Sequence, residues 1–187
     1  MDLQVLLCGV GGQGILFATR ILSEAAMRSG QQVIGSETHG MSQRGGSVTS
    51  HMKVGDYRGP LIRRGDADVI FCFEKGEIFG NLTFLKPGGT IYIDAPDLDF
   101  IPKNVLSLLD EKGMTIHHMD ASVQAMKMKA PLVLNLILIG FAARHEDFLI
   151  SEEDLVEVIT SVSPVKFKEM NLKAFHIGLG KHILEEL

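Results

Sequence analysis

The chain contains no tryptophan, only two cysteines, and no apolar run long enough to cross a membrane. Its longest apolar run covers residues 132–143 and is interrupted by Asn135. A membrane-spanning helix needs roughly 20 apolar residues, so a buried helix is expected there. The N-terminus also lacks the basic region, apolar stretch and cleavage site of a signal peptide. We therefore expect a cytoplasmic protein with no membrane contact.

The shortage of cysteine excludes one class of cofactor site. A [4Fe–4S] cluster takes four thiolates, and Cys8 and Cys72 cannot supply them. Both cysteines lie in apolar, strand-like segments, where small buried side chains are expected. A disulfide between neighbouring strands is conceivable, but an intracellular chain would keep both thiols reduced. The usual thiamine diphosphate signature begins with Gly-Asp-Gly and is also missing, because residues 65–67 read Gly-Asp-Ala.

Basic residues are also too few for a nucleic-acid-binding surface. The formal net charge is −5 and the isoelectric point is about 5.8, whereas a nucleic-acid footprint is normally a basic patch or stripe. The 187 residues are 45% hydrophobic and 22% charged, which is typical of a globular protein. This length fits a single domain over residues 1–187.

Strand-like and helical segments alternate along the chain, and this order indicates an α/β fold. Strands are expected at residues 3–8, 32–35, 47–54, 67–73, 90–94 and 115–119. Helices are expected at residues 12–29, 74–85, 102–112, 121–129, 132–144, 151–161 and 165–187. The prediction is a doubly wound, mostly parallel, Rossmann-like sheet with helices on both faces and a helical C-terminal third.

The first of two glycine-rich loops is Gly9-Val10-Gly11-Gly12-Gln13-Gly14. It has the G-x-G-x-x-G spacing of dinucleotide-binding loops, between a predicted strand and a predicted helix. The helix N-terminus behind it presents free N–H groups that suit a phosphate or carboxylate. Two interpretations stay open: the glycines bring a ligand close to the backbone, or they only allow a tight turn and close packing.

The second loop crowds polar residues around Gly40, Gly45 and Gly46. Its candidate site residues are Glu37, His39, Ser42, Gln43 and Arg44. Since the carboxyl ends of adjacent strands meet at the ligand crevice of an open α/β sheet, both loops could line one site. Glu37 follows the first loop at the distance where a Rossmann acid binds the ribose 2′-OH. Arg44 could instead take Glu37 as an ion-pair partner.

These motifs, taken in order, resemble a known family. The segments GVGGQG (residues 9–14), THGMSQRGG (38–46), HMKVG (51–55), ADVI (67–70) and NLKAFHIG (171–178) are similar to the gamma-type domain of 2-oxoacid:ferredoxin oxidoreductases. The form of the second motif is most similar to that of the indolepyruvate branch, in its beta subunit. The resemblance covers most of the chain.

The resemblance implies that this chain is one subunit of a larger enzyme. That enzyme would convert a 2-oxoacid, coenzyme A (CoA) and oxidised ferredoxin to acyl-CoA, CO₂ and reduced ferredoxin. Thiamine diphosphate, Mg²⁺ and [4Fe–4S] clusters would lie on a larger alpha subunit, and this chain would bind none of them. Without that partner, a homodimer would not be surprising, because an apolar surface would be exposed.

The resemblance gives the glycine loops two alternative roles. They would shape the approach of substrate or CoA, or they would only contact the partner subunit; no catalytic residue is assigned. The residues concerned are Gly11, Gly12, Gln13, Gly14, Glu37, His39, Ser42, Gln43 and Arg44. Arg44 would be the electrostatic element, because a guanidinium can bind a carboxylate or phosphate through two hydrogen bonds.

The first loop taken alone supports two other functions, a stand-alone NAD(P)-dependent dehydrogenase and a non-catalytic nucleotide-binding module. The dehydrogenase would need a catalytic group beside the nicotinamide, and little length remains for a second lobe. His117 and His118 are adjacent on a predicted strand and point to opposite faces, so they cannot chelate one metal together. We expect each to be a surface or core residue.

Overall fold

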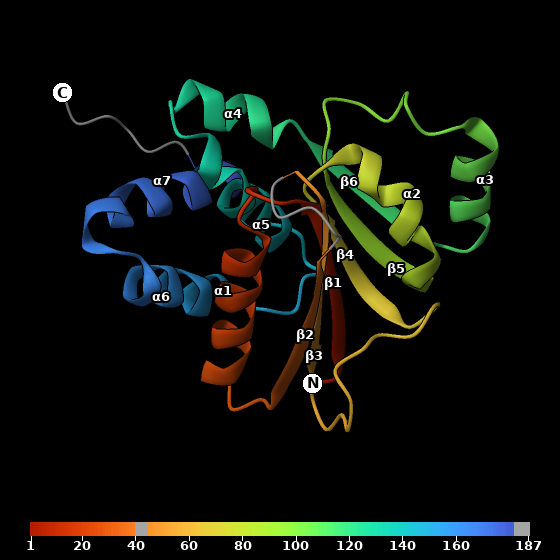
Figure 1. Ribbon diagram of the computed structural model, residues 1–187, viewed down its shortest axis with the longest axis horizontal. Coiled ribbons are helices and arrows are strands. Elements are labelled where there is room, and N and C mark those ends of the chain that lie inside the picture. The colour runs from red at the N-terminus through yellow and green to blue at the C-terminus, as the bar shows by residue number, and fades with distance from the viewer. Residues whose placement is uncertain (40–44, 182–187) are drawn as a thin grey trace.

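The computed structural model of the protein describes residues 1–39 and 45–181 (Figure 1). Within these residues, six strands form one sheet in the order β2-β3-β1-β4-β5-β6. The strands are β1 (Leu3–Val10), β2 (Val33–His39), β3 (Ser47–Val54), β4 (Ala67–Cys72), β5 (Leu85–Asp94) and β6 (Thr115–Met119). Strands β1, β4, β5 and β6 are parallel, whereas β3 is antiparallel to both β1 and β2. The predicted α/β class with a mostly parallel sheet is confirmed.

Helices cover both faces of this sheet. They are α1 (Ile15–Arg28), α2 (Ile78–Asn81), α3 (Lys103–Glu111), α4 (Ala121–Lys127), α5 (Leu134–Ala143), α6 (Glu152–Val162) and α7 (Lys168–Gly178). Figure 1 shows α1, α5, α6 and α7 on one side of the sheet and α2 and α3 on the other. The predicted helical C-terminal third is confirmed, but the last helix, expected at residues 165–187, ends at Gly178, and residues 182–187 lie outside the described part. Ser151 caps α6 by accepting the Asp154 N–H, at 3.1 Å.

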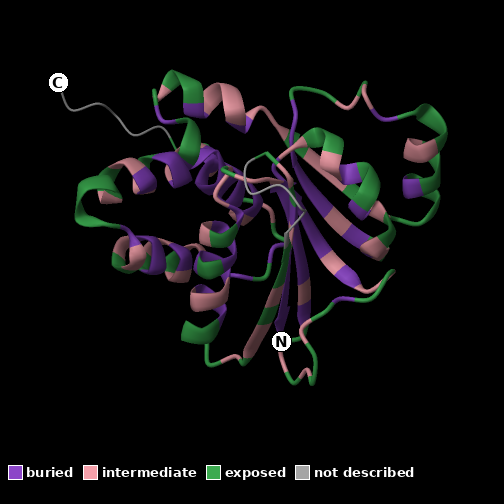
Figure 2. Ribbon diagram, viewed as in Figure 1, coloured by how far each residue is buried: buried purple, intermediate pink, exposed green. Residues whose placement is uncertain are grey.

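Alternating side chains of the central strands fill two cores. Phe71 of β4 belongs to the larger core beneath α1, α5, α6 and α7, whereas Ile70 and Cys72 belong to the smaller core that includes Ile78 of α2. Figure 2 shows the buried residues gathered on the strands and on the sides of the helices that face the sheet. Burial of β4 on both faces agrees with its nearly continuous apolar sequence.

Two strands are longer than the sequence predicts. β2 continues to His39, where residues 32–35 were expected, because it pairs with β3 over its whole length as an antiparallel hairpin. β5 begins at Leu85 instead of residue 90. The glycines at residues 88 and 89 suggest a turn, but Gly88 adopts a φ of 75° inside the strand, where the pairing with β4 shifts register between Ala67 and Val69. The two glycines therefore mark a β-bulge inside β5 and not a turn before it.

Candidate functional site

The first glycine-rich loop contacts the last residue of the second, Gly46, at the carboxyl end of β1. The Gly11 N–H donates to the carbonyl oxygen of Gly46 at 2.9 Å. The first loop follows the carboxyl end of β1, and Gly46 immediately precedes β3. Of the second loop, Ser42, Gln43 and Arg44 lie outside the described residues, while the backbone of His39 ends β2.

Gly14 joins the first loop to α1 in a conformation that favours glycine. Its φ is 74°, in the left-handed region, and it forms the N-cap of α1. A Cβ at this position would overlap the side-chain amide of Asn135, at the start of α5. The Asn135 amide donates to the carbonyl oxygen of Gly14 at 2.9 Å, and its own oxygen accepts the Leu136 N–H at 2.8 Å. The loop is therefore held in place by α5.

Gln13 connects the end of β1 to the end of β4. Its side-chain oxygen accepts the Val10 N–H at 2.8 Å, and its side-chain nitrogen donates to the carbonyl oxygen of Phe73 at 3.0 Å. The same nitrogen lies 3.4 Å from a carboxylate oxygen of Glu74. The crevice between two such strand ends is where open α/β sheets usually bind ligands. Here the Gln13 side chain bridges that crevice, so its polar atoms serve the protein itself.

A cavity of about 300 Å³ opens beside the first glycine loop. It is bordered by that loop, the N-terminal end of α5 and the segment that leads into α7. The lining residues are Gly12, Gly14, Phe17, Leu132, Val133, Asn135, Leu136, Pro164, Phe167, Met170 and Asn171. Most of this lining is apolar, so the cavity suits an apolar group with few polar contacts.

A second cavity, of about 180 Å³, lies at the carboxyl ends of β4 and β5 and contains groups that the sequence analysis missed. Its lining includes Glu74, Lys75, Asp94, Asp120 and Ser122. Asp94 accepts both the N–H and the hydroxyl of Ser122, and Asp120 caps α4 by accepting the Val123 N–H at 3.0 Å. These two carboxylates therefore help to hold the N-terminus of α4. Their positions in the sequence could have indicated this site, because Asp94 ends one predicted strand and Asp120 directly follows another.

Glu37 lies in the β2 strand and not in a loop. It is exposed and pairs in register with Ser50 of β3. Because β3 separates β2 from β1, Glu37 is two strand spacings, roughly 10 Å, from the strand that carries the first loop. In the dinucleotide-binding fold, β2 is the direct neighbour of β1. This strand order argues against a ribose-binding role for Glu37.

The two cysteines are neighbours across the β1 and β4 strands. Cys8 and Cys72 are in register, fully buried and free. The hydrogen bond with Cys72, and next burial, raise the pKa of the Cys8 thiol well above its ordinary value. Such protonated thiols in a core are poor metal ligands. The donor set of this chain therefore does not fit an iron–sulfur cluster.

Comparison with known proteins identifies the family. Residues 4–180 match the model of the pyruvate ferredoxin/flavodoxin oxidoreductase family. The chain is 36% identical to indolepyruvate oxidoreductase subunit IorB of Thermococcus kodakarensis, over 95% of each chain. It is 31% identical to the subunit of the same name from Methanothermobacter thermautotrophicus, over 96% of this chain and 97% of the relative.

A solved structure of the family contains the same fold. It is 2-oxoglutarate:ferredoxin oxidoreductase from Magnetococcus marinus with 2-oxoglutarate, coenzyme A and succinyl-CoA bound. The TM-score is 0.76 at 25% identity, and the match covers 96% of this chain but 31% of the solved one. None of the helices in residues 1–39 and 45–181 is long and apolar enough to cross a membrane. The chain belongs to the pyruvate ferredoxin/flavodoxin oxidoreductase family.

Proposed function

We propose that this chain is the smaller subunit of a 2-oxoacid:ferredoxin oxidoreductase whose substrate is indolepyruvate or another aryl pyruvate. One observation carries the proposal: similarity over nearly the full length to two subunits named for indolepyruvate, at 31% and 36% identity. The reaction would be the CoA-dependent oxidative decarboxylation of the 2-oxoacid to acyl-CoA and CO₂, with electrons passed to ferredoxin.

The cofactors of this reaction would lie on a larger partner subunit. Two buried thiols that face each other support this assignment, because they offer no ligands for an iron–sulfur cluster. Thiamine diphosphate and Mg²⁺ would also be bound by the partner. Free thiols fit a reducing compartment, so we place the complex in the cytoplasm.

The partner would cover the cavity beside the first glycine loop. Three apolar side chains at or near its rim are exposed: Leu132 by 69%, Phe167 by 43% and Val165 by 93%. Apolar groups gathered in this way are typical of protein interaction surfaces. In the absence of the partner, the same surface favours self-association of the isolated chain.

The second glycine loop would meet the substrate or CoA. Arg44 would bind a carboxylate or phosphate through its guanidinium, and His39, Ser42 and Gln43 would add polar contacts. Gln13 and Gly14 would act indirectly, since their polar atoms already hold the first loop to β4 and α5. The competing role for the second loop is contact with the partner subunit alone.

The test of the function is reconstitution with the larger subunit. The chain should co-purify with a cysteine-rich, thiamine-binding partner, and the complex should reduce ferredoxin or a viologen dye with indolepyruvate and CoA. Activity with pyruvate or 2-oxoglutarate but not with aryl pyruvates would reject the substrate class. A chain that binds NAD(H) tightly and recruits no partner would instead support the dehydrogenase.

A charge substitution tests the interface. Phe167→Asp places a charge on the rim of the cavity and should prevent assembly with the larger subunit, because burial of an unpaired charge is unfavourable. Leu108→Asp is the matched control, since Leu108 is 48% exposed on α3, on the opposite face of the sheet. Normal assembly of both variants would place the partner elsewhere.

Arg44→Ala separates the two roles of the second loop. Loss of activity in an assembled complex, with a raised KM for CoA or the 2-oxoacid, would support ligand contact. Arg63→Ala is the control, because Arg63 is exposed just before the start of β4, at the opposite end of the parallel strands. Unchanged kinetics in Arg44→Ala would reject the ligand-contact role.

A further inference from the structure

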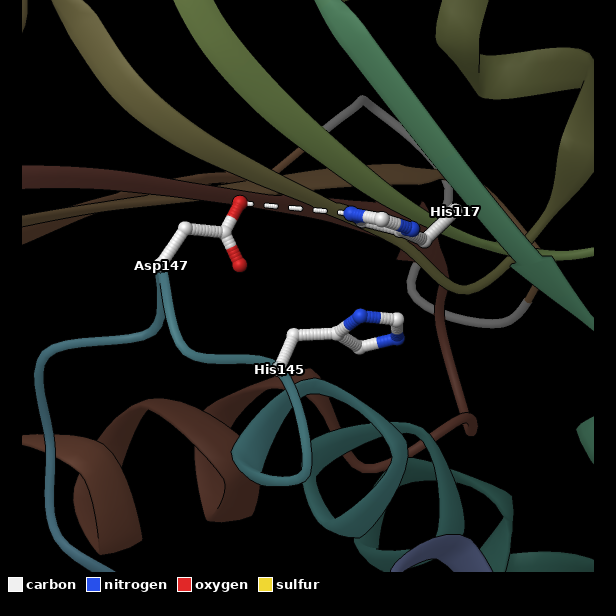
Figure 3. Close-up of side chains that lie close together, drawn as sticks. All are labelled: His117, His145 and Asp147. Carbon is white, nitrogen blue, oxygen red and sulfur yellow. Dashed lines mark ion pairs between the residues drawn. The ribbon is translucent and has the colours of Figure 1, made fainter.

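Three side chains from distant parts of the sequence converge away from the glycine loops. His117 lies on β6, and His145 and Asp147 lie in the segment that follows α5 (Figure 3). The two imidazole rings lie 3.9 Å apart between centroids, with 31° between their planes. One possible ligand atom from each of the three residues lies within 4.8 Å of the other two. Figure 3 shows both rings and the carboxylate around one shared space.

Both histidines can offer a nitrogen to a metal ion. Burial is the largest cause that lowers the pKa of His117 and of His145. A neutral imidazole presents one nitrogen lone pair, and a metal ligand must be deprotonated in this way.

Asp147 completes the set with a carboxylate. Burial alone would raise its pKa, but the hydrogen bonds that it accepts, first of all from Thr90 and Tyr92, produce a net decrease. The Tyr92 hydroxyl donates to one carboxylate oxygen and the Thr90 hydroxyl to the other, each at 2.9 Å. A carboxylate has about four lone-pair sites, so two remain for a cation.

The surrounding residues hold the three groups in position. The Tyr92 ring stacks on His117 at 5.3 Å with 17° between the planes, and Tyr92 also donates to Asp147. Oriented outer partners of this kind are a feature of metal sites. In addition, His145 Nε2 is shielded from solvent and has no hydrogen-bond partner among the described residues.

We propose that His117, His145 and Asp147 form a binding site for a divalent transition-metal ion, with Zn²⁺ as the best match. Zn²⁺ takes imidazole nitrogen and carboxylate oxygen, and three protein ligands leave one position for water. Ligands of one tetrahedral Zn²⁺ lie about 3.3 Å apart, so the three groups must close by roughly 1.5 Å at most. The Asp147 side chain is the most exposed of the three, at 45%, so it has the most room to adjust.

The site would lie away from the first glycine loop. α5 spans Leu134–Ala143, its second residue Asn135 contacts that loop, and helix geometry places Asn135 and His145 roughly 15 Å apart along the helix. A metal ion would tie the segment after α5 to β6, near one edge of the sheet. It would therefore stabilise the fold.

Metal binding by the full chain tests the proposal directly. The chain, free of any purification tag and treated with a chelator, is dialysed against Zn²⁺ in excess, and bound zinc is measured together with the melting temperature. We expect one Zn²⁺ per chain and a higher melting temperature with metal. His117→Ala and His145→Ala should each weaken binding at least about tenfold and abolish the thermal shift.

His118→Ala is the matched control. His118 is the next residue of β6, its side chain is exposed, and it lies outside the cluster, so this variant should bind Zn²⁺ like the original chain. Asp147→Asn preserves the side-chain shape and removes the charge, which provides a folded variant if an alanine substitution prevents folding. No bound zinc in the original chain, or equal binding by His117→Ala and His118→Ala, would overturn the proposal.

Discussion

The glycine loop and the histidine cluster lie at opposite ends of α5, and they differ in how their polar groups are satisfied. In the loop, Gln13 and Asn135 direct their side-chain amides to backbone groups of the protein. In the cluster, His145 Nε2 is buried with no partner among the described residues. In the region with the clear sequence motif, these polar side chains are satisfied by the protein itself, whereas the region without one retains an unpartnered nitrogen.

This difference separates packing from recognition. A glycine pattern indicates a backbone with positive φ or with close neighbours. Gly14 has both, because its φ is positive and its Cα lies against the side chain of Asn135. Capacity to bind a ligand depends instead on groups left without partners, which only the folded chain displays. Substitutions at the two ends of α5 should therefore have different effects on stability.

The largest loss of stability is expected for Asn135→Ala. This change leaves the Leu136 N–H without its acceptor, removes the bond to Gly14 and opens space in a buried position. We expect the free energy of unfolding to fall by about 2–4 kcal/mol, measured by urea denaturation. Asn104→Ala, at an exposed position of α3, should change it by less than about 0.5 kcal/mol. Equal effects of the two variants would mean that Asn135 does not hold the first glycine loop in place.

Gln13 should show a smaller effect that depends on the substituted group. Gln13→Ala removes the bonds to Val10 and Phe73 and should cost about 1–3 kcal/mol. Gln13→Glu keeps the acceptor for Val10 but turns a carboxylate toward the Phe73 carbonyl and Glu74, so it should be no more stable than Gln13→Ala. Normal stability of both variants, with loss of activity in the assembled enzyme, would show that Gln13 contacts a ligand instead.

The parts of the fold that follow from local periodicity could be predicted from the sequence. The strand Ala67–Cys72 is apolar except for Asp68, and the cap at Ser151 depends on residues three positions apart. The extension of β2 to His39 could not be found in this way, because it depends on pairing with β3 across residues that read as a polar loop.

The glycine loops could be predicted from the sequence, whereas the histidine cluster could not. Gly11 meets Gly46 because β3 runs antiparallel beside β1, so the start of β3 lies next to the end of β1; the sequence indicated only that the carboxyl ends of adjacent strands share one side of the sheet. For His117, the sequence allows a comparison only with His118, its neighbour along the strand. Its neighbours in the fold, His145 and Asp147, come after α4 and α5 in the sequence. No spacing rule connects residues that are brought together by the packing of a helix on a sheet.

A third histidine, His51, makes the stability of the fold depend on pH. His51 is buried on β3, and its Nδ1 accepts the Ile62 N–H at 3.2 Å, so its ring is satisfied. Burial, and next the charge of Lys53, lower the pKa of His51 below its ordinary value of 6.5. The unfolded chain therefore takes up a proton near pH 6.5 while the folded chain does not. Stability from this group is complete above pH 6.5 and is lost as the pH falls toward the folded pKa.

Thermal unfolding measured from pH 8 to pH 5 checks this direction. The melting temperature should decrease below pH 6.5, and His51→Gln should show a shallower decrease, although it starts lower because the contact with Ile62 is altered. His176→Gln is the control, since His176 lies on α7 with partial exposure. The same slope in His51→Gln and in the original chain would mean that other groups cause the acid sensitivity.

The smallest effect is expected at the far end of α5, for His145→Ala in metal-free protein. The side chain is partly exposed and its Nε2 has no hydrogen-bond partner within residues 1–39 and 45–181, so the loss is limited to ring contacts with His117, Tyr92 and Phe141. We expect a decrease of less than about 1 kcal/mol in the free energy of unfolding. With Zn²⁺ present the difference should grow, because only the original chain gains binding energy. A loss in metal-free protein as large as that of Asn135→Ala would mean that both ends of α5 are packing contacts.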